Sequence, residues 1–380
     1  LDIGLKPGAS YSHALPREHN AFVSVFEGAA VIDGKPVVRG QLAVLANVGP
    51  LNRPTTKAAY LAGTDNPYQL FSHADQQAQW QTTFSDEPSR TGWGGRLADA
   101  VKSMNGSAAM PVSTSIAGNV LFAQGSATSA LTVPSSGTFG LSDNGTNSIA
   151  RARQQALAAL LGEGRDHTLV METADGLANA INLSTIVNPV ISATNTTIQS
   201  LFNTTGNSLA LQLQQVAKLI AARDTFGVKR QVFFVSLGGF DTHTGQLNTQ
   251  VNLLTQVGDA MKSFYDATAT LGVADRVTSF TLSDFGRTFK PAAGGGSDHA
   301  WGNHHFIMGG AVKGGAMYGT FPSLALTGPD DVSSEGRWLP STSVDQYAAT
   351  LATWFGVTDA QLSGVLPNLA AFPTKNLGFL

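Results

Sequence analysis

Residues 231–243 read Gln-Val-Phe-Phe-Val-Ser-Leu-Gly-Gly-Phe-Asp-Thr-His. The apolar run 231–237 predicts a buried β-strand, and the paired glycines after it let the backbone turn sharply beside a ligand. Ligands of open α/β sheets collect beyond the carboxyl ends of strands, so Asp241 and His243 are candidate site residues. On an extended segment, their spacing puts both side chains on one side. The alternative is a helix-capping aspartate beside an unrelated histidine.

Apolar runs and helical patterns alternate along the chain around this stretch. The expected strands are 41–47, 231–237, 276–282 and 305–308, and the expected helices, with apolar residues at helical spacing, are 209–220, 247–264 and 344–354. The last helix begins at a capping-box pair, Ser343 and Gln346, and ends at Gly356. Strands that alternate with helices predict an α/β fold with a mostly parallel central sheet and helices on both faces.

Two stretches depart from this alternation. Residues 1–40 are short β segments broken by turns, so we expect an atypical N-terminal β segment that is either fused to the chain or wrongly assigned to it. One α/β domain then covers residues 41–380. Residues 181–208 are rich in Asn, Thr and Ser, which predicts a polar insertion that forms a lid over the sheet or a surface excursion.

Composition excludes several classes of protein. The 380 residues include 23 Lys and Arg, 26 Asp and Glu, and no cysteine. No basic run suggests a nucleic-acid surface, no apolar stretch is long enough for a membrane span, and disulfides and thiolate metal sites are excluded. The low charge and the many Ser, Thr, Asn and Gly residues favour a periplasmic or secreted protein. Residue 1 is not Met, so we expect a processed or truncated chain without its signal peptide.

A second polar cluster, Ser-Asp-Phe-Gly-Arg-Thr at 283–288, follows the predicted strand 276–282. We expect Asp284 to lie at the same rim of the sheet as Asp241 and to bind a metal. Arg287 is a candidate catalytic residue, because its planar guanidinium can clamp an anionic group. The alternative is a turn aspartate with a surface arginine.

A third cluster, Ser-Asp-His-Ala-Trp-Gly-Asn-His-His at 297–305, follows the glycine-rich loop 292–296. Histidine is the commonest neutral metal ligand, and a mixed Asp/His set suits Zn or Mn, with Mg or Ca as weaker alternatives. We expect His299 and His305 to bind the metal with Asp241 and His243, and His304 to contact substrate. The alternative is a structural loop whose histidines cap carbonyl groups.

A fourth candidate lies at 71–77, Phe-Ser-His-Ala-Asp-Gln-Gln. Ser72 is expected to begin a helix, where the helix dipole and free backbone N–H groups favour an anion. A hydroxyl in that place suits a nucleophile that attacks phosphorus or sulfur, and a metal would lower its pKa. His73 is expected to contact substrate. The alternative is an ordinary serine N-cap.

These motifs together resemble the domain-of-unknown-function 1501 family over about residues 41–375. The segments that carry the resemblance are 42–54, 70–81, 92–99, 238–243, 283–288, 298–305, 309–318 and 343–357. By similarity that family belongs to the alkaline phosphatase and sulfatase superfamily, which implies an alkaline phosphatase-like fold. It also implies two metals and displacement at a phosphate or sulfate ester, with Ser72, or else Thr55 or Thr56, as the attacking hydroxyl.

One departure from the family lies at the N-terminus. Members begin with an apolar strand that ends in a Gly-Gly-Asn-Asp-like motif, which is absent here, so the resemblance also allows a one-metal or inactive protein. Residues 1–45 instead resemble the cupin-like pirin family. Asp2 and Asp33 lack a ligand context, and we expect His13 and His19 at the surface.

The sequence thus predicts a metal-dependent hydrolase of an anionic ester, free or carried on a glycan or polymer. The alternative is a non-catalytic protein of the same fold that binds a glycan, a surface polymer or a partner. A cupin-type domain is a third reading, but residues 1–45 are too short for a closed cupin barrel.

Overall fold

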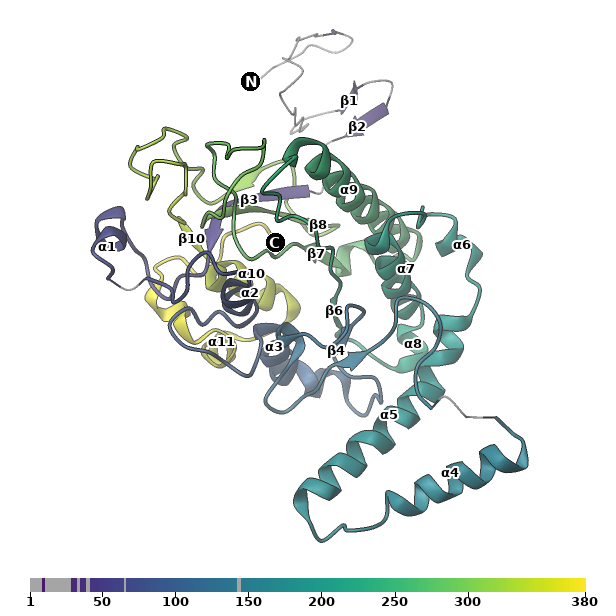
Figure 1. Ribbon diagram of the computed structural model, residues 1–380. Coiled ribbons are helices and arrows are strands. Elements are labelled where there is room, and N and C mark those ends of the chain that lie inside the picture. Colours follow the sequence, from purple (N-terminus) through teal and green to yellow (C-terminus); the bar gives the residue numbers. More distant parts are fainter. Residues whose placement is uncertain (1–8, 11–28, 33–34, 39–41, 65, 142–144) are drawn as a thin grey trace.

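The computed structural model describes residues 9–10, 29–32, 35–38, 42–64, 66–141 and 145–380 (Figure 1). The predictions for Asp2, His13, His19 and Asp33, and most of the pirin-like segment, lie outside the described residues. Strands β1 (Ala29–Ile32) and β2 (Lys35–Val38) form an antiparallel pair by themselves. None of the described helices combines the length and apolar character needed to cross a bilayer.

The larger sheet is built around β3 (Leu42–Gly49), the predicted strand 41–47. The parallel neighbours of β3 are β10 (Thr342–Ser343) and β9 (Met317–Tyr318). Its other neighbour, β8 (Asn303–Gly309), is antiparallel to both β3 and β7 (Thr278–Phe280). The prediction of a mostly parallel central sheet is therefore wrong here. Parallel neighbours need a long crossover, usually a helix, whereas a helix-free loop joins β7 to β8.

The strand within 231–243 lies in a second sheet. Here β5 (Leu131–Thr132), β4 (Ser113–Ser115) and β6 (Val232–Phe234) are parallel, in that order. Among the described residues β6 pairs only with β4 and β7 pairs only with β8, so the strands that we expected in one sheet fall in two separate sheets.

Helices cover both faces of these strands (Figure 1). Successive residues of a strand point to opposite faces, and on β6 Val232 packs in one apolar core while Phe233 packs against another. The first core takes α3 (Trp93–Val101), α10 (Val344–Phe355) and α11 (Asp359–Val365). The second takes α5 (Thr168–Ser192), α7 (Ser208–Ala221) and α9 (Gln246–Thr270).

The remaining helices are short or peripheral. The α-helices among them are α1 (Lys57–Leu61), α2 (His73–Thr82), α4 (Ser148–Leu160), α6 (Thr196–Gln199) and α8 (Arg223–Phe226). The 3₁₀ helices are η1 (Lys102–Asn105), η2 (Leu121–Ala123), η3 (Ala274–Arg276) and η4 (Pro367–Ala371).

The predicted capping box of α10 is confirmed. The Ser343 backbone N–H donates to Gln346 Oε1 at 3.0 Å, and the Ser343 hydroxyl accepts from the backbone N–H of Asp345 at 3.1 Å. The helix ends at Gly356, whose φ of 110° is a conformation that glycine adopts without strain.

The polar stretch 181–208 is mostly helical. It contains the end of α5 and the short helix α6, and most of its apolar side chains are buried in the second core or packed against it. Leu183, Val187 and Ile191 recur every four residues, which is one face of a helix. The many Asn, Thr and Ser residues between them masked this period in the sequence.

A buried carboxyl in α10 makes stability depend on pH. Asp345 is 1% exposed, and burial raises its pKa from 3.8 to about 7, although Ser343 and Arg96 favour the ionised form. A carboxyl whose pKa is raised by folding contributes stability below its unfolded pKa. That contribution is lost as pH rises through the folded pKa, here over the window from 3.8 to about 7.

We therefore expect Asp345→Asn to abolish the loss of stability that the wild type shows as pH rises, because asparagine has a similar shape and no charge. The gain over the wild type should grow between pH 5 and pH 8 to a few kcal/mol, since one unit of pKa corresponds to about 1.4 kcal/mol. Denaturant unfolding at both pH values measures it. A variant whose stability changes with pH as the wild type does would contradict the assignment.

Candidate metal centre

Three imidazoles meet at one carboxylate. His73 is the first residue of α2, His243 lies in the loop after β6, and His299 lies in the loop before β8. Their Nε2 atoms lie 3.3, 2.9 and 3.1 Å from the carboxylate oxygens of Asp241, in that order. His73, Asp241 and His299 each offer a ligand atom within 4.8 Å of the others. The sequence prediction that distant Asp and His residues meet at one place agrees with this geometry.

The opposite nitrogen of each imidazole is held by an oxygen atom. His73 Nδ1 lies 2.5 Å from Asp284 Oδ2, His243 Nδ1 lies 3.1 Å from Asp298 Oδ1, and His299 Nδ1 lies 2.6 Å from the Phe71 carbonyl oxygen. With a cation in the centre, the accepting oxygens would hold the ring proton on Nδ1 and the Nε2 lone pair would face inward, which is the arrangement typical of metal-binding histidines. Without a cation, an Nε2 atom can donate to Asp241, as that of His299 does at 3.1 Å.

The inward nitrogens are crowded together. His243 Nε2 and His299 Nε2 are 3.0 Å apart, and two lone pairs at that distance repel unless a proton or cation lies between them. His73 Nε2 is buried and has no hydrogen-bond partner among the described residues. His73, His299 and Asp241 form a group that could hold a metal ion, and two imidazole nitrogens with a carboxylate suit Zn²⁺, whereas His243 contacts two of these residues but is not part of the group.

Asp241 is ionised over the whole physiological range. Burial by itself raises its pKa, but hydrogen bonds from Arg287 and His299 and the charges of His243 and His73 outweigh burial and lower the pKa to about 2. The carboxylate is therefore ionised and can serve as an anionic ligand, although the Arg287 guanidinium 2.7 Å away offsets its charge.

Arg287 holds the site together. One terminal nitrogen donates to Asp241 Oδ1 at 2.7 Å, Nε donates to the Ser297 hydroxyl at 3.2 Å, and the other terminal nitrogen donates to the Ser297 carbonyl. Every guanidinium nitrogen thus has a protein acceptor. In this structure Arg287 fixes Asp241 against the loop of His299 with three of its five N–H groups, and its role in clamping an anion stays a prediction.

Two loops that carry ligands are joined by backbone hydrogen bonds. These are Ser297 N–H to Thr242 O at 3.1 Å, Gly245 N–H to Gly294 O at 3.1 Å, and Gln246 N–H to Gly295 O at 3.0 Å. The glycines of the 292–296 loop allow this contact. Gly294 and Gly295 have φ of 85° and 71°, and a Cβ atom at Gly296 would overlap the carbonyl group of His243.

The start of α2 is held in an unusual backbone conformation. Phe71 has φ of 71°, which is rare for a residue with a side chain and is found most often at functional sites. Its N–H donates to Gln76 Oε1 at 2.6 Å, and its ring lies 4.8 Å from the Arg337 guanidinium. Arg337 also donates to the His299 carbonyl at 2.8 Å. This conformation aims the Phe71 carbonyl at His299.

Ser72 lies between two residues that contact the cluster, Phe71 and His73. It is the N-cap residue of α2, but its side chain makes no capping hydrogen bond. Its hydroxyl instead donates to Asp75 Oδ2 at 2.5 Å. No hydrogen bond of the described residues joins the Ser72 hydroxyl to the histidine cluster, so its role as a nucleophile stays a prediction.

Thr55 and Thr56, the alternative nucleophiles, stay predictions as well. Thr56 is the N-cap of α1, where its hydroxyl accepts from the Ala59 N–H at 3.1 Å. Within the described part of the chain, no hydrogen bond or ion pair joins Thr55 or Thr56 to the histidine cluster.

Asp284 was expected to bind the metal directly. The structure places Asp284 behind His73, where its carboxylate contacts Nδ1, the nitrogen that faces away from Asp241. Gln77 Nε2 also donates to Asp284 at 3.3 Å. Burial raises the pKa of Asp284, but the hydrogen bonds from His73 and Gln77 lower it by more, so the net shift of the pKa is downward. Asp284 therefore orients a ligand.

His304 and His305 lie apart from the cluster. His305 is buried in the core, with Nδ1 3.2 Å from the Thr281 hydroxyl and Nε2 against Asn303, and burial lowers its pKa to about 3. His304 faces the other side of β8 and stacks on Phe321. His305 was expected to bind the metal, but the structure places it in the core. Among the described residues, His304 makes no contact with the cluster.

Sequence reasoning missed three groups that the structure places here. Asp298 directly precedes His299, and a carboxylate beside a ligand histidine was a usable signal. Asp75 stands three residues after Ser72, a spacing that brings side chains together on a helix. The Phe71 carbonyl gave no signal, because its role depends on backbone conformation.

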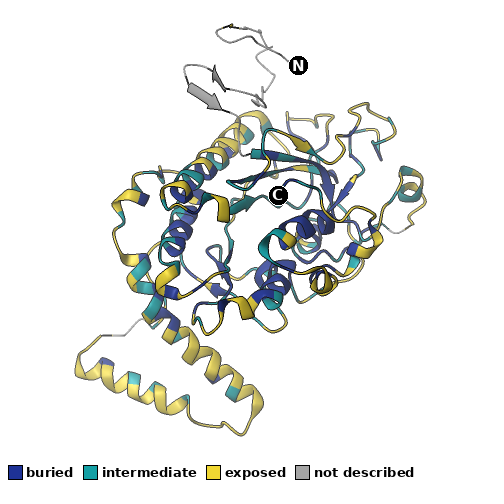
Figure 2. Cartoon of the chain, turned by 180° about the vertical axis from the view of Figure 1, so that it is seen from behind, coloured by how far each residue is buried: buried dark blue, intermediate teal, exposed yellow. Residues whose placement is uncertain are grey.

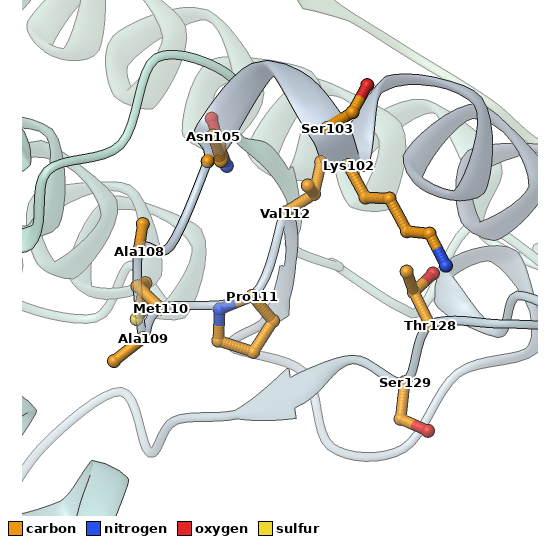
Figure 3. A pocket seen from close by; sticks show the side chains of 11 residues that line it. Lys102, Ser103, Asn105, Ala108, Ala109, Met110, Pro111, Val112, Thr128 and Ser129 are labelled. Carbon is orange, nitrogen blue, oxygen red and sulfur yellow. The ribbon is translucent and has the colours of Figure 1, made fainter.

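An open groove of about 470 Å³ lies elsewhere, where Lys102, Asn105, Met110, Pro111 and Thr128 are among the lining residues (Figure 3). It has no carboxylate or imidazole among its lining residues, so it offers neither a metal site nor a general base.

Comparison with known proteins gives one match. A family model described as "Protein of unknown function (DUF1501)" matches residues 6–362. No curated protein and no solved structure matches the chain.

Proposed function

The chain belongs to the DUF1501 family, whose description names no reaction, and we propose that it is a metal-dependent hydrolase of phosphate or sulfate esters. The observation that carries this proposal is the convergence of three Nε2 atoms on Asp241. A relation to the alkaline phosphatase and sulfatase superfamily is part of the proposal. It rests on the order of the sequence motifs.

The donor set favours one ion held by His73, His299 and Asp241, with His243 as a further nitrogen donor that would have to move closer. Three nitrogen donors suit Zn²⁺ or Mn²⁺ better than Mg²⁺ or Ca²⁺, which prefer oxygen. Because Asp284 contacts His73, we propose one ion in place of the two that the superfamily implies. When bound, such an ion polarises an ester oxygen and offsets the charge that develops there.

The chain's own residues would supply the attacking group. Ser72 loses its hydroxyl proton to Asp75, and its oxygen forms a bond to phosphorus or sulfur as the bond to the ester oxygen breaks. The departing alcohol takes up a proton. Water then displaces Ser72 from the covalent ester, which releases phosphate or sulfate and restores the hydroxyl.

We propose the substrate and compartment that the sequence predicts, an anionic ester, free or on a glycan or polymer, outside the cytoplasm. The main support is chemical. Phosphate and sulfate groups are drawn to a cation centre next to a helix N-terminus, and α2 begins at His73.

Ser72→Ala tests the proposal. We expect the variant to bind the metal as the wild type does and to lose hydrolysis of p-nitrophenyl phosphate or p-nitrophenyl sulfate by at least about a hundredfold, because the covalent route is removed. Metal content of the dialysed protein and turnover of both esters are the measurements. Ser89→Ala, outside the cluster, is the matched control.

Two outcomes would contradict the proposal in different ways. Wild-type protein without a bound divalent ion would remove the metal centre. Metal without turnover of either ester would leave a scaffold that binds its ligand without chemistry, which is the alternative function predicted from the sequence.

A further inference from the structure

The loop that joins β9 to β10 passes from an exposed part into a buried part (Figure 2). Residues 319–330 are mostly exposed, whereas residues 331–340 are mostly buried or half-buried. The second part is folded around the carboxylate of Asp331, which is 0% exposed. This carboxylate accepts hydrogen bonds from the backbone N–H groups of Ser333 and Arg337 at 2.9 and 3.0 Å. The backbone of Arg337 is therefore fixed in place.

The Arg337 side chain leaves this loop and contacts two segments of the candidate metal centre. Its Nε atom donates to the His299 carbonyl oxygen at 2.8 Å, and its guanidinium lies 4.8 Å from the centre of the Phe71 ring. A terminal nitrogen lies 3.6 Å from Glu335 Oε2. A planar guanidinium can donate hydrogen bonds from its edge while its face covers an aromatic ring, which a lysine ammonium cannot do. Arg337 therefore joins the two segments.

Phe71 has a backbone conformation that must be held in place. Its φ of 71° is unfavourable for a residue with a Cβ atom, and such a conformation persists only where the surrounding contacts fix it. The N–H of Phe71 is fixed by Gln76 Oε1. Its ring packs against the apolar cluster that contains Trp301, and the Arg337 guanidinium covers it. Because ring and carbonyl belong to one residue, a shift of the ring also moves the carbonyl away from His299 Nδ1.

The same loop holds the segment of His299 at a second point. The Trp338 carbonyl oxygen accepts a hydrogen bond from the Gly302 N–H at 2.9 Å. His299 thus depends on Arg337 in two ways. Its carbonyl group accepts directly from the guanidinium, and its ring nitrogen lies against the carbonyl oxygen of Phe71, the residue that the guanidinium covers.

We propose that Arg337 is a positioning residue of the metal centre, which fixes the His299 ring by holding the His299 backbone and the Phe71 turn together. The part that concerns an ion rests on the proposed function, whereas the coupling of Arg337 to Phe71 does not. The charge of Arg337 gives no reason for its place, because a positive group beside a cation repels it. A role in positioning and a role of the charge alone therefore predict changes of opposite sign in metal affinity.

Titration of Arg337→Met with Zn²⁺ tests the proposal. We expect the Kd for Zn²⁺ to rise about 10- to 100-fold, the usual effect of losing a residue that orients a ligand, whereas loss of a positive charge alone would lower the Kd. Arg337→Lys keeps the charge without the planar group, so it should recover only part of the affinity. Arg230→Met is the matched control and should leave the Kd unchanged, because Arg230 makes the same two contacts elsewhere: it donates to the Phe355 carbonyl at 2.7 Å and lies over the Phe355 ring.

A second substitution, Phe71→Gly, tests the route through Phe71. Glycine adopts a φ of 71° without strain and has no ring for the guanidinium to cover. Arg337→Met should therefore raise the Kd for Zn²⁺ by a smaller factor in the Phe71→Gly protein than in the wild type. Equal factors in the two backgrounds would show that Arg337 does not act through Phe71.

Hydrogen exchange of the metal-free protein separates this proposal from the proposed function. The Phe71 N–H donates to Gln76 Oε1 at 2.6 Å, so its exchange reports opening of the turn. Arg337→Met should speed this exchange by about tenfold or more, because a charged hydrogen bond and a ring contact are lost, and Arg230→Met should not change it. A wild type that binds no Zn²⁺ would remove the proposed function, and the exchange rates would still decide whether Arg337 holds the turn.

Three results would overturn the proposal. The first is exchange at Phe71 that is the same in Arg337→Met as in the wild type. The second is an Arg337→Met protein that binds Zn²⁺ as tightly as the wild type, or more tightly. The third is a rise in the KM for p-nitrophenyl phosphate with unchanged Zn²⁺ affinity, which would assign Arg337 to the substrate instead.

Discussion

Replacing Asp241 with asparagine is expected to remove the metal and the activity together. Asp241 is the carboxylate on which all three imidazoles converge, and asparagine keeps its shape without its charge. Loss of a residue one step behind a metal ligand already lowers affinity by about 10- to 100-fold, so loss of a direct ligand should exceed about 100-fold. Hydrolysis should fall by about a thousandfold or more, because a metal contributes several kcal/mol to the transition state.

Metal titration and ester turnover measure the two effects. The control is Asp266→Asn, which changes an exposed aspartate paired with Lys262 on α9 and should alter neither property. An Asp241→Asn protein that still binds the ion with wild-type affinity would show that the cation, if any, lies elsewhere. Circular dichroism checks that the variant is folded, so that loss of metal is not caused by unfolding.

Replacing Gly296 with alanine is expected to separate the two ligand loops. The added methyl group would overlap the carbonyl group of His243 and the amide of Thr244, so the backbone must move. Overpacking of this kind costs about 1–3 kcal/mol of stability. A shift of about 1 Å in a catalytic group can lower the rate about a hundredfold, so activity should fall much more than stability.

Gly258→Ala is the matched control. Gly258 lies within α9, and a Cβ atom there meets nothing within 4 Å. The same chemical change should therefore stabilise the protein by about 0.5–1 kcal/mol, because alanine favours a helix over glycine. If Gly296→Ala behaved like Gly258→Ala in metal affinity and turnover, close contact of the two loops would not matter for the site.

Local patterns predicted the elements better than their arrangement. The capping box at Ser343 and the apolar run at 231–237 depend on neighbouring residues, so the sequence contains what is needed to place them. The direction of β8 depends on how the chain returns from β7. That return is a long loop without secondary structure, and no local pattern determines its path.

The same limit applies to the candidate site. The sequence predicted that Asp241, His243 and His299 would share a place, because strand ends gather at one rim. It did not separate a ligand from the group that orients it, so Asp284 was taken for a ligand and Asp298 was not assigned. That distinction depends on which ring nitrogen faces which oxygen.

Strand alternation could have separated the three histidines near residue 300. In β8, His305 and Ile307 are two residues apart and are both buried, whereas His304 faces the other side. A strand over these residues therefore predicts a core role for His305. His299 precedes the strand and is free to enter the site.

The hydrogen bond between His73 and Asp284 joins positions 211 residues apart, and the one between Phe71 and His299 joins positions 228 residues apart. Loop closure over such distances is slow and happens late in folding. A nascent chain that ends before His299 therefore lacks one residue of the cluster and cannot form the complete group. A bound ion would link the segments that carry these residues. Separating the segments would therefore require release of the ion.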